Sequence, residues 1–225
     1  MGKDKLKRFA EVEQFKNVLQ PKMEDLLNGF HLKGKWSQEF FGNDNPIILE
    51  LGCGKGEYTV GLARKHKEFN FIGIDIKGSR IWKGAKTCIE ERIDNAAFVR
   101  SKVDFVDQLF GKDEIAEIWL TFSDPQPKRA RKRLTSPLFI NRYKKMMRPG
   151  GIINIKTDSD LLFEYTMEQI EEHNYTNHLC SWDVYGELLK DATEDIEYKM
   201  GIRTFYESKW LEMGIKTKYC QFGID

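Results

Sequence analysis

The chain is short of cysteine and of long apolar segments, and each shortage excludes a class of protein. Its four cysteines, Cys53, Cys88, Cys180 and Cys220, lie far apart and form no C-x-x-C pair, so they predict neither a zinc ribbon nor a disulfide framework. We expect four reduced thiols, as in the cytosol. No apolar run approaches the roughly 18 residues of a membrane-spanning helix, and no apolar stretch follows the basic N-terminus to make a secretory signal. We therefore expect a cytoplasmic protein without membrane association.

Length and composition favour a single globular domain. The 225 residues are 40% hydrophobic and 32% charged, which suits a soluble α/β protein with its own core. Residues 1–8 are basic and expected to be mobile, and residues 9–20 predict a short amphipathic helix that ends at Pro21. We predict an N-terminal extension over residues 1–45 and one domain over residues 46–225.

Residues 46–156 alternate between short apolar runs and longer amphipathic stretches. The predicted strands cover residues 46–51, 69–75, 96–101, 114–122 and 152–157, the last after a turn at Pro149-Gly150-Gly151. The predicted helices cover residues 57–67, 78–94, 136–147, 159–172 and 204–213. Such alternation is typical of βαβ units, so we predict a Rossmann-like α/β fold with a mostly parallel central sheet and helices on both faces.

Three alternating glycines, Gly52, Gly54 and Gly56, lie where the first strand of this domain turns into its first helix, directly after Glu50 and Leu51. Glycines permit a tight turn with positive φ and let a ligand approach the backbone. Asp75 closes the next strand, about twenty residues past the glycines, where folds of this kind bind a ribose diol. The pattern favours a nucleoside-containing cofactor.

The choice of cofactor depends on Glu50 and on the glycine spacing. The glycines lack the third position of G-x-G-x-x-G, and Glu50 would repel a pyrophosphate while suiting a cationic sulfonium or amino group. We therefore predict S-adenosylmethionine and no metal; a nicotinamide or flavin nucleotide and a purely structural turn remain alternatives. Asp104, at the start of the helix after the third strand, is expected at the adenine edge or as a helix N-cap.

The segment after the fourth strand, TFSDPQPKRARKR over residues 121–133, joins an acid to a basic run. Two prolines give this loop a stiff path at the carboxyl end of the strand, where open α/β sheets bind ligands, so Asp124 is predicted to face the cofactor. Five of the six residues from 128 to 133 are basic, enough to contact several phosphates of a nucleic acid. A solvated charged face is the alternative for this run.

These residues resemble the bacterial tRNA (guanine-N7-)-methyltransferases, whose signature is an F-S/P-D-P-W-P-K loop followed by basic residues. Gln126 occupies the tryptophan position here, and the loop is about two residues shorter than the commonest version. The likeness continues in Lys156-Thr157-Asp158 and in Thr204-Phe205-Tyr206-Glu207, which are similar to the family's K-T-D and T-x-Y-E motifs. It spans roughly residues 47–220, with four motifs in order.

The resemblance implies a class I methyltransferase fold and transfer of a methyl group to N7 of a guanosine in the tRNA variable loop, at position 46. It assigns Glu50, Asp75, Asp104 and Asp124, with the three glycines, to the cofactor pocket. It assigns Lys128, Arg129, Arg131, Asp158, Thr204, Tyr206 and Glu207 to the substrate. Asp124 and Asp158 are the expected catalytic residues, because carboxylates can accept hydrogen bonds from the guanine N1–H and N2 amino group.

Each substrate residue also has a structural alternative. Tyr206 could pack rather than stack on the base, Glu207 could complete a capping box with Thr204, and Asp158 could cap the following helix. The alternatives for the whole protein are a methyltransferase of the same fold acting on a small molecule or a protein, and a tRNA-binding subunit without catalysis. The sequence leaves both a monomer and a homodimer open.

Overall fold

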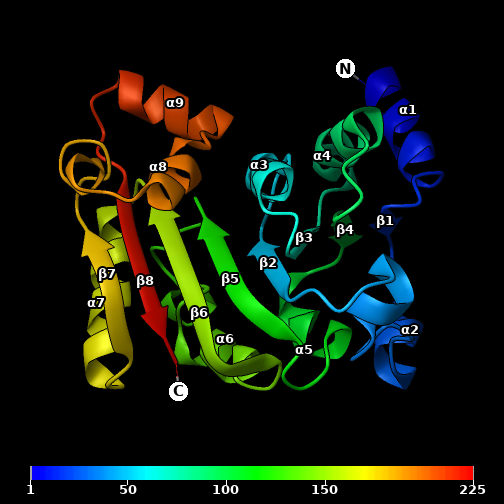
Figure 1. Ribbon diagram of the computed structural model, residues 1–225, viewed down its shortest axis with the longest axis horizontal. Coiled ribbons are helices and arrows are strands. Elements are labelled where there is room, and N and C mark those ends of the chain that lie inside the picture. The colour runs from blue at the N-terminus through cyan, green and yellow to red at the C-terminus, as the bar shows by residue number, and fades with distance from the viewer. Residues whose placement is uncertain (1, 225) are drawn as a thin grey trace.

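The computed structural model describes residues 2–224, with side-chain environments from residue 6 onward, and it is built around one twisted sheet (Figure 1). The strands within these residues are β1 (Val18–Leu19), β2 (Ile47–Leu51), β3 (Asn70–Asp75), β4 (Ala96–Arg100), β5 (Ile115–Thr121), β6 (Met147–Thr157), β7 (Thr176–Ser181) and β8 (Lys218–Gly223). Their order across the sheet is β1-β4-β3-β2-β5-β6-β8-β7. Only β8 runs antiparallel to its neighbours β6 and β7.

Helices cover both faces of the sheet because the strand residues alternate between two apolar clusters. The α-helices of the described residues are α1 (Gly2–Val12), α2 (Met23–Asn28), α3 (Glu57–Lys65), α4 (Gly78–Glu91), α5 (Val106–Leu109), α6 (Pro137–Tyr143), α7 (Asp160–Glu172), α8 (Glu194–Gly201) and α9 (Phe205–Glu212). One face of the sheet packs against α3 and α4, and the other packs against α5, α6 and α7. The predicted α/β architecture is confirmed.

Strands β2 to β5 and helices α3, α4, α7 and α9 lie where the sequence predicts them, but two other predictions are wrong and one helix was missed. Helix α1 covers residues 2–12 rather than 9–20, and its Glu11 accepts a hydrogen bond from the Trp82 indole of α4 (2.7 Å). Strand β6 begins at Met147 and includes the predicted turn as a bulge with Gly150 at φ +72°. Helix α8 was not predicted. Its apolar pattern is weak, since Met200 is the one residue of this helix that is fully buried.

The N-terminal segment is part of the main core. Strand β1 pairs in parallel with β4, and the π-helical turn Trp36–Phe41 places the Trp36 ring, fully buried, against Phe110. The Trp36 indole donates to the backbone oxygen of Leu109 (3.0 Å), and the backbone N–H of Trp36 donates to the Glu114 carboxylate (2.9 Å). These contacts fix the segment before β2 to the end of α5.

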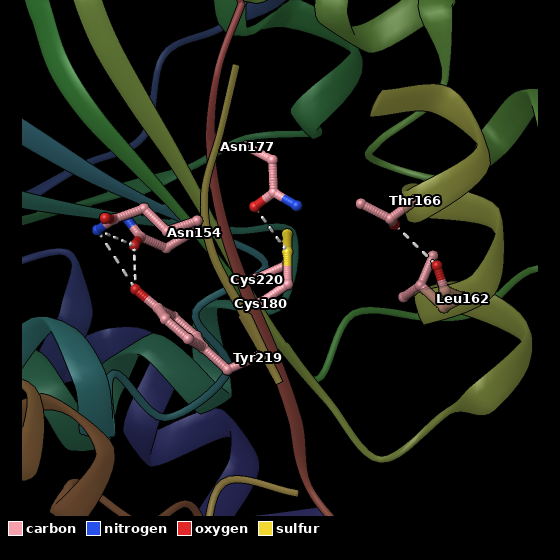
Figure 2. The surroundings of a disulfide bond; sticks show 8 residues. Asn154, Leu162, Thr166, Asn177, Cys180, Tyr219 and Cys220 are labelled. Atoms are coloured by element: carbon pink, nitrogen blue, oxygen red, sulfur yellow. Dashed lines mark hydrogen bonds between the residues drawn. A yellow bond between two sulfur atoms is a disulfide. The ribbon is translucent and has the colours of Figure 1, made fainter. Parts of the chain in front are cut away.

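A disulfide joins Cys180 of β7 to Cys220 of β8, so the prediction of four reduced thiols is wrong for this pair (Figure 2). The two residues are 40 positions apart, and antiparallel pairing places them opposite each other. The spacing in the sequence does not reveal that pairing, since strand register is fixed by tertiary structure. Next to it, the Tyr219 hydroxyl of β8 donates to Asn154 of β6 (2.6 Å). Cys53 and Cys88 are buried free thiols.

Among the described residues, no helix has the length and apolar character needed to cross a membrane. Helices α8 and α9 lie at the end of the sheet toward which the arrowheads of β5 and β6 point (Figure 1). The carboxyl ends of the parallel strands and the segment from α8 to α9 therefore share one side of the molecule.

We expect Trp36→Ala to lower the free energy of unfolding by about 3–5 kcal/mol, because it removes a fully buried ring and leaves a cavity. Leu27→Ala, a truncation in the neighbouring helix α2 at a side chain that is 77% exposed, should change it by less than about 0.5 kcal/mol. Urea unfolding of both variants measures the difference. Equal losses would show that the N-terminal segment adds nothing to the core.

Candidate active site

The glycine loop between β2 and α3 forms the floor of the candidate site. Gly52, Gly54 and Gly56 have φ values of +79°, +57° and +75°, a region in which side chains other than glycine are strained. A Cβ on Gly56 would lie 2.6 Å from the Phe98 ring, whereas a Cβ on Gly52 or Gly54 would meet nothing within 4 Å. Gly56 is thus required for packing, while the first two glycines leave the backbone open toward space.

Asp75 links this loop to the end of β3. Its Oδ2 accepts a hydrogen bond from the backbone N–H of Gly54 (3.0 Å), and its Oδ1 accepts one from the N–H of Lys77 (2.7 Å). The N–H groups of Gly52 and Cys53 both donate to the backbone oxygen of Ile74 (2.8 and 3.0 Å). The carboxylate is therefore oriented by two backbone donors, and its remaining lone pairs can accept from a ligand hydroxyl.

The carboxylate of Glu50 is held by hydrogen bonds from two threonines. Its Oε2 accepts from the N–H and hydroxyl of Thr59 (2.8 and 2.6 Å), and its Oε1 accepts from the Thr121 hydroxyl (2.7 Å). Burial raises the pKa of this carboxyl group to about 7, although the hydrogen bonds from Thr121 and Thr59 oppose the rise. Glu50 ties β2 to α3 and β5, and it lines neither of the two cavities described next.

Two cavities meet at Gly52. The larger one, about 520 Å³, is lined by Gly52, Asp75, Ile76, Ser101, Lys102, Val103, Asp104, Asp124, Gln126, Arg129, Lys132, Leu134 and Phe139. The smaller one, about 130 Å³, is lined by Gly52, Cys53, Gly54, Lys55, Glu57, Arg80, Thr121, Phe122, Thr204, Phe205 and Tyr206. The structure therefore brings Asp75, Asp104 and Asp124 together around one cavity, and brings Thr204 and Tyr206 to its neighbour.

Asp104 faces the larger cavity from the 3₁₀ turn Val103–Phe105. It forms an ion pair with Lys132 of the basic run (2.8 Å), and the hydrogen bond from Lys132 lowers the pKa of the Asp104 carboxyl group. The alternative that Asp104 is a helix N-cap is wrong, since Lys102 occupies the cap position of this turn and Phe105 that of the following helix α5.

The loop after β5 holds Asp124 at the rim of the larger cavity. Oδ1 of Asp124 accepts from the backbone N–H of Gln126 (2.9 Å), which is the geometry of an Asx turn. Arg133 donates from Nε to the backbone oxygen of Pro125 (2.9 Å) and lies over the Tyr165 ring, so this arginine is buried and stabilises the loop. The side chains of Lys128, Arg129 and Arg131 are exposed.

Asp158 directly follows β6, the neighbour of strand β5 that leads to Asp124. The register pairs Thr121 of β5 with Lys156 of β6, so the two acids leave neighbouring strand ends at the same edge of the sheet. Ser159, not Asp158, caps α7 by accepting from the N–H of Leu162 (3.2 Å), which makes the capping alternative for Asp158 wrong. Asp158 is half-buried, and its backbone oxygen accepts from Lys218 (2.9 Å).

Glu207 is fully buried and paired with Lys156, which sequence reasoning did not predict. Lys156 Nζ lies 2.7 Å from Glu207 Oε1 and also donates to the backbone oxygen of Met200 (2.9 Å). Burial lowers the pKa of Lys156 to about 8, and the Glu207 charge opposes this. Thr204 caps α9 by accepting from the N–H of Glu207 (3.1 Å), so one half of the predicted capping box forms while the carboxylate turns to Lys156.

Two aromatic side chains project at the mouth of the smaller cavity. Phe205 and Tyr206 are 61% and 52% exposed, so Tyr206 is not a core residue as the packing alternative required. Lys55 Nζ lies 4.6 Å from the Phe205 ring centre. Sequence reasoning missed Lys55, Arg80, Phe122 and Phe205. Lys55, Phe122 and Phe205 each lie inside a motif of the sequence analysis, which is the signal that could have found them, whereas Arg80 carried none.

Residues 44–220 match the family model described as "Putative methyltransferase". A tRNA (guanine-N(7)-)-methyltransferase from Bacteroides thetaiotaomicron is 47% identical, with 100% of this chain and 87% of that protein covered. Another of the same name, from Christiangramia forsetii, is 48% identical, with 99% of both chains covered. The chain belongs to the tRNA (guanine-N(7)-)-methyltransferase family. The family resemblance of the sequence motifs is thus confirmed.

Solved structures support the same fold at much lower sequence identity. The 16S rRNA methyltransferase KamB gives a TM-score of 0.63 at 14% identity, with 86% of this chain and 94% of that chain covered. An antibiotic-related methyltransferase gives 0.58 at 16% identity, with 82% and 90% covered. This tRNA (guanine-N(7)-)-methyltransferase family member therefore has the class I methyltransferase fold.

We expect the stability of Glu50→Gln to differ from that of the wild type in a pH-dependent way. The pKa of Glu50 is raised from 4.5 to about 7 on folding, so the stability that the neutral group contributes is fully present below pH 4.5 and lost as pH rises through 7. Glutamine keeps the shape of the neutral acid. The unfolding free energy of the wild type minus that of Glu50→Gln should fall by about 2–3 kcal/mol from pH 5 to pH 8.

Urea unfolding at pH 5, 6, 7 and 8 measures this difference. Asp44→Asn, a change of the same chemistry in an exposed residue before β2, serves as the control. A difference for Glu50→Gln that stays constant with pH would show that Glu50 is ionised throughout this range.

Proposed function

We propose that this enzyme transfers a methyl group from S-adenosylmethionine to N7 of a guanosine in the variable loop of tRNA, at position 46, forming 7-methylguanosine. The observation that carries the proposal is full-length identity of 47–48% to proteins named tRNA (guanine-N(7)-)-methyltransferase. The glycine loop, the acids around the larger cavity and the exposed basic loop supply the features that such a reaction needs.

The larger cavity suits S-adenosylmethionine in size and chemistry. A volume of about 520 Å³ is ordinary for a site that encloses a ligand of this size. The open side of Gly52 and Gly54 accepts close approach, Asp75 is oriented to accept from the ribose hydroxyls, and Asp104 borders the same cavity. When bound, S-adenosylmethionine supplies an electrophilic methyl group. No cluster of three potential metal ligands occurs among the described residues.

The reaction at N7 calls for alignment more than for proton transfer. Guanine N7 carries a lone pair and no proton, so no general base is required, and the protein contributes by holding the base in line with the methyl–sulfur bond. Asp124 and Asp158, at neighbouring strand ends, are the residues we assign to the guanine N1–H and N2 amino group. Their negative charge favours the positive charge that develops on the purine.

The base and the phosphates of the tRNA contact different parts of this site. Tyr206 lies at the mouth of the smaller cavity, where its exposed ring can stack on a base turned out of its loop. Glu207 does not contact the base itself. Its ion pair with Lys156 holds the start of α9, and so positions Thr204 and Tyr206 for the substrate. Lys128, Arg129 and Arg131 are exposed and contact phosphates.

The remaining assignments follow from the substrate. We assign the enzyme to the cytoplasm, where tRNA is modified, acting as a monomer or homodimer. We assign methyl transfer to residues 46–225 and treat residues 1–45 as an extension that completes the sheet through β1.

The first test is methyl transfer from labelled S-adenosylmethionine to tRNA transcripts. A transcript with guanosine in the variable loop should be labelled, while the same transcript with 7-deazaguanosine there should not, because its C7–H has no lone pair. Equal labelling of both transcripts would reject N7 as the target. Labelling of a small molecule or protein in the absence of RNA would favour another substrate class.

Tyr206→Ala should lower kcat/KM for tRNA by roughly 10-fold or more, because stacking on an aromatic ring contributes about 1–3 kcal/mol per base. Tyr206→Phe should retain most of the activity. Met213→Ala, which truncates another exposed side chain at the end of α9, is the matched control and should leave kcat/KM unchanged. Full activity of Tyr206→Ala in steady-state kinetics would mean that no base stacks at this position.

A further inference from the structure

A third cavity adjoins the smaller cavity of the candidate active site and shares no lining residue with the larger cavity, which the basic loop borders. It has a volume of about 490 Å³ and is lined by Lys55, Gly56, Glu57, Val60, Gly61, Arg64, Lys83, Gly84, Thr87, Tyr198, Gly201, Ile202 and Arg203. It shares Lys55 and Glu57 with the smaller cavity at Tyr206. We call it the α3–α4–α8 groove after the helices that form it. Because of these shared residues, the groove is continuous with the smaller cavity, to which we assigned the target base.

Cationic side chains outnumber carboxylates in this groove, in a chain whose net charge is only +1. Its lining holds four cationic side chains and one carboxylate, that of Glu57. One of the four, Arg64, is neutralised by two hydrogen bonds to Glu91 (2.6 and 2.7 Å). Lys55, Lys83 and Arg203 are exposed and form no ion pair among the described residues.

The positions of these three cations are set by the fold. Lys55 lies over the Phe205 ring, and the Arg203 guanidinium lies 4.8 Å from the Tyr185 ring centre. A cation held against an aromatic face keeps its N–H groups available to an anion. Lys83 projects from α4 one residue before Gly84, where the helix passes close to the backbone of Lys55. Three cations from different segments thus border one channel.

We propose that the α3–α4–α8 groove binds backbone phosphates of the same tRNA, on the opposite side of the target nucleotide from Lys128, Arg129 and Arg131. This inference rests on the proposed function. A nucleotide turned into a pocket leaves its strand running away in two directions, and each direction carries phosphates. The basic loop contacts the phosphates on one side of the flipped nucleotide, and the groove contacts those on the other side. Phosphate contacts of this kind position the strand without reading its sequence.

The test compares Lys83→Glu with Lys112→Glu, which makes the same charge change at an exposed lysine between α5 and β5. We measure the Kd of full-length protein for unmodified tRNA transcript across a range of salt concentrations. Lys83→Glu should weaken binding roughly 10-fold at low salt and reduce the slope of log Kd against log salt by about one, as loss of one phosphate contact does. Lys112→Glu should match the wild type in both.

Further measurements separate a contact from a structural defect. The affinity of Lys83→Glu for S-adenosylmethionine and its unfolding midpoint should equal those of the wild type, and the KM for tRNA should rise with little change in kcat. The double variant Lys83→Gln/Arg203→Gln should reduce the salt slope by about two.

The outcomes distinguish this inference from the function on which it rests. Suppose that the wild-type protein methylates tRNA but Lys83→Glu and Lys112→Glu show the same slope of log Kd against log salt. The groove then binds no phosphate, and the proposed function stands. Wild-type protein that neither binds nor methylates tRNA would overturn both.

Discussion

The buried ion pair between Lys156 and Glu207 determines where the C-terminal part of the chain lies. Both side chains are fully buried, and the Tyr185 hydroxyl donates to the same carboxylate oxygen (2.7 Å). Lys156 also donates to the backbone of Met200 at the end of α8. Loss of one partner would leave a charge buried without compensation, which destabilises proteins by about 3–5 kcal/mol. The pair therefore fixes α8 and α9 to the end of β6 and places the two exposed aromatic rings over the glycine loop.

A second constraint acts below those rings, where the glycine loop approaches α4 closely. Gly84 of α4 leaves room for the backbone of Lys55, since a Cβ there would lie 2.7 Å from the oxygen of Lys55. Gly56 and Gly84 both pack against the Phe98 ring. Two glycines therefore bring loop, helix and sheet together, which leaves the first half of the loop free to face a ligand. Packing requirements and ligand access are thus divided between different glycines of one motif.

The sequence was sufficient for the parallel strands β2 to β5 and for the acids around the larger cavity, because both depend on local signals. Alternating apolar runs define β2 to β5, and an acid after a strand end is visible in the sequence as Asp75 or Asp124. The partners of Glu50 and Glu207 were not predictable, since strand pairing brings Thr121 to Glu50 and the packing of α9 on the sheet brings Lys156 to Glu207. The same holds for Cys180 and Cys220.

The motif residues also divide into those that face the cavities and those that hold such residues in place. Arg133, inside the basic run, is buried against Tyr165 and supports Pro125, while Arg129 and Arg131 remain exposed. A count of basic residues does not separate the two roles, because burial depends on which side chain meets a tertiary partner. Which residues of a motif are exposed and which are buried is decided only when the neighbouring strands and helices pack around them.

The ion pair between Asp104 and Lys132 connects the larger cavity to the basic loop. Both side chains are substantially exposed, so the pair contributes at most about 1 kcal/mol. A ligand that hydrogen-bonds Asp104, or a phosphate that pairs with Lys132, can therefore replace it at little cost. Both side chains line the larger cavity, so a ligand there meets a carboxylate and an ammonium group that are free to separate. This contact can adjust to a ligand, whereas the buried pair at Lys156 keeps the surrounding framework fixed.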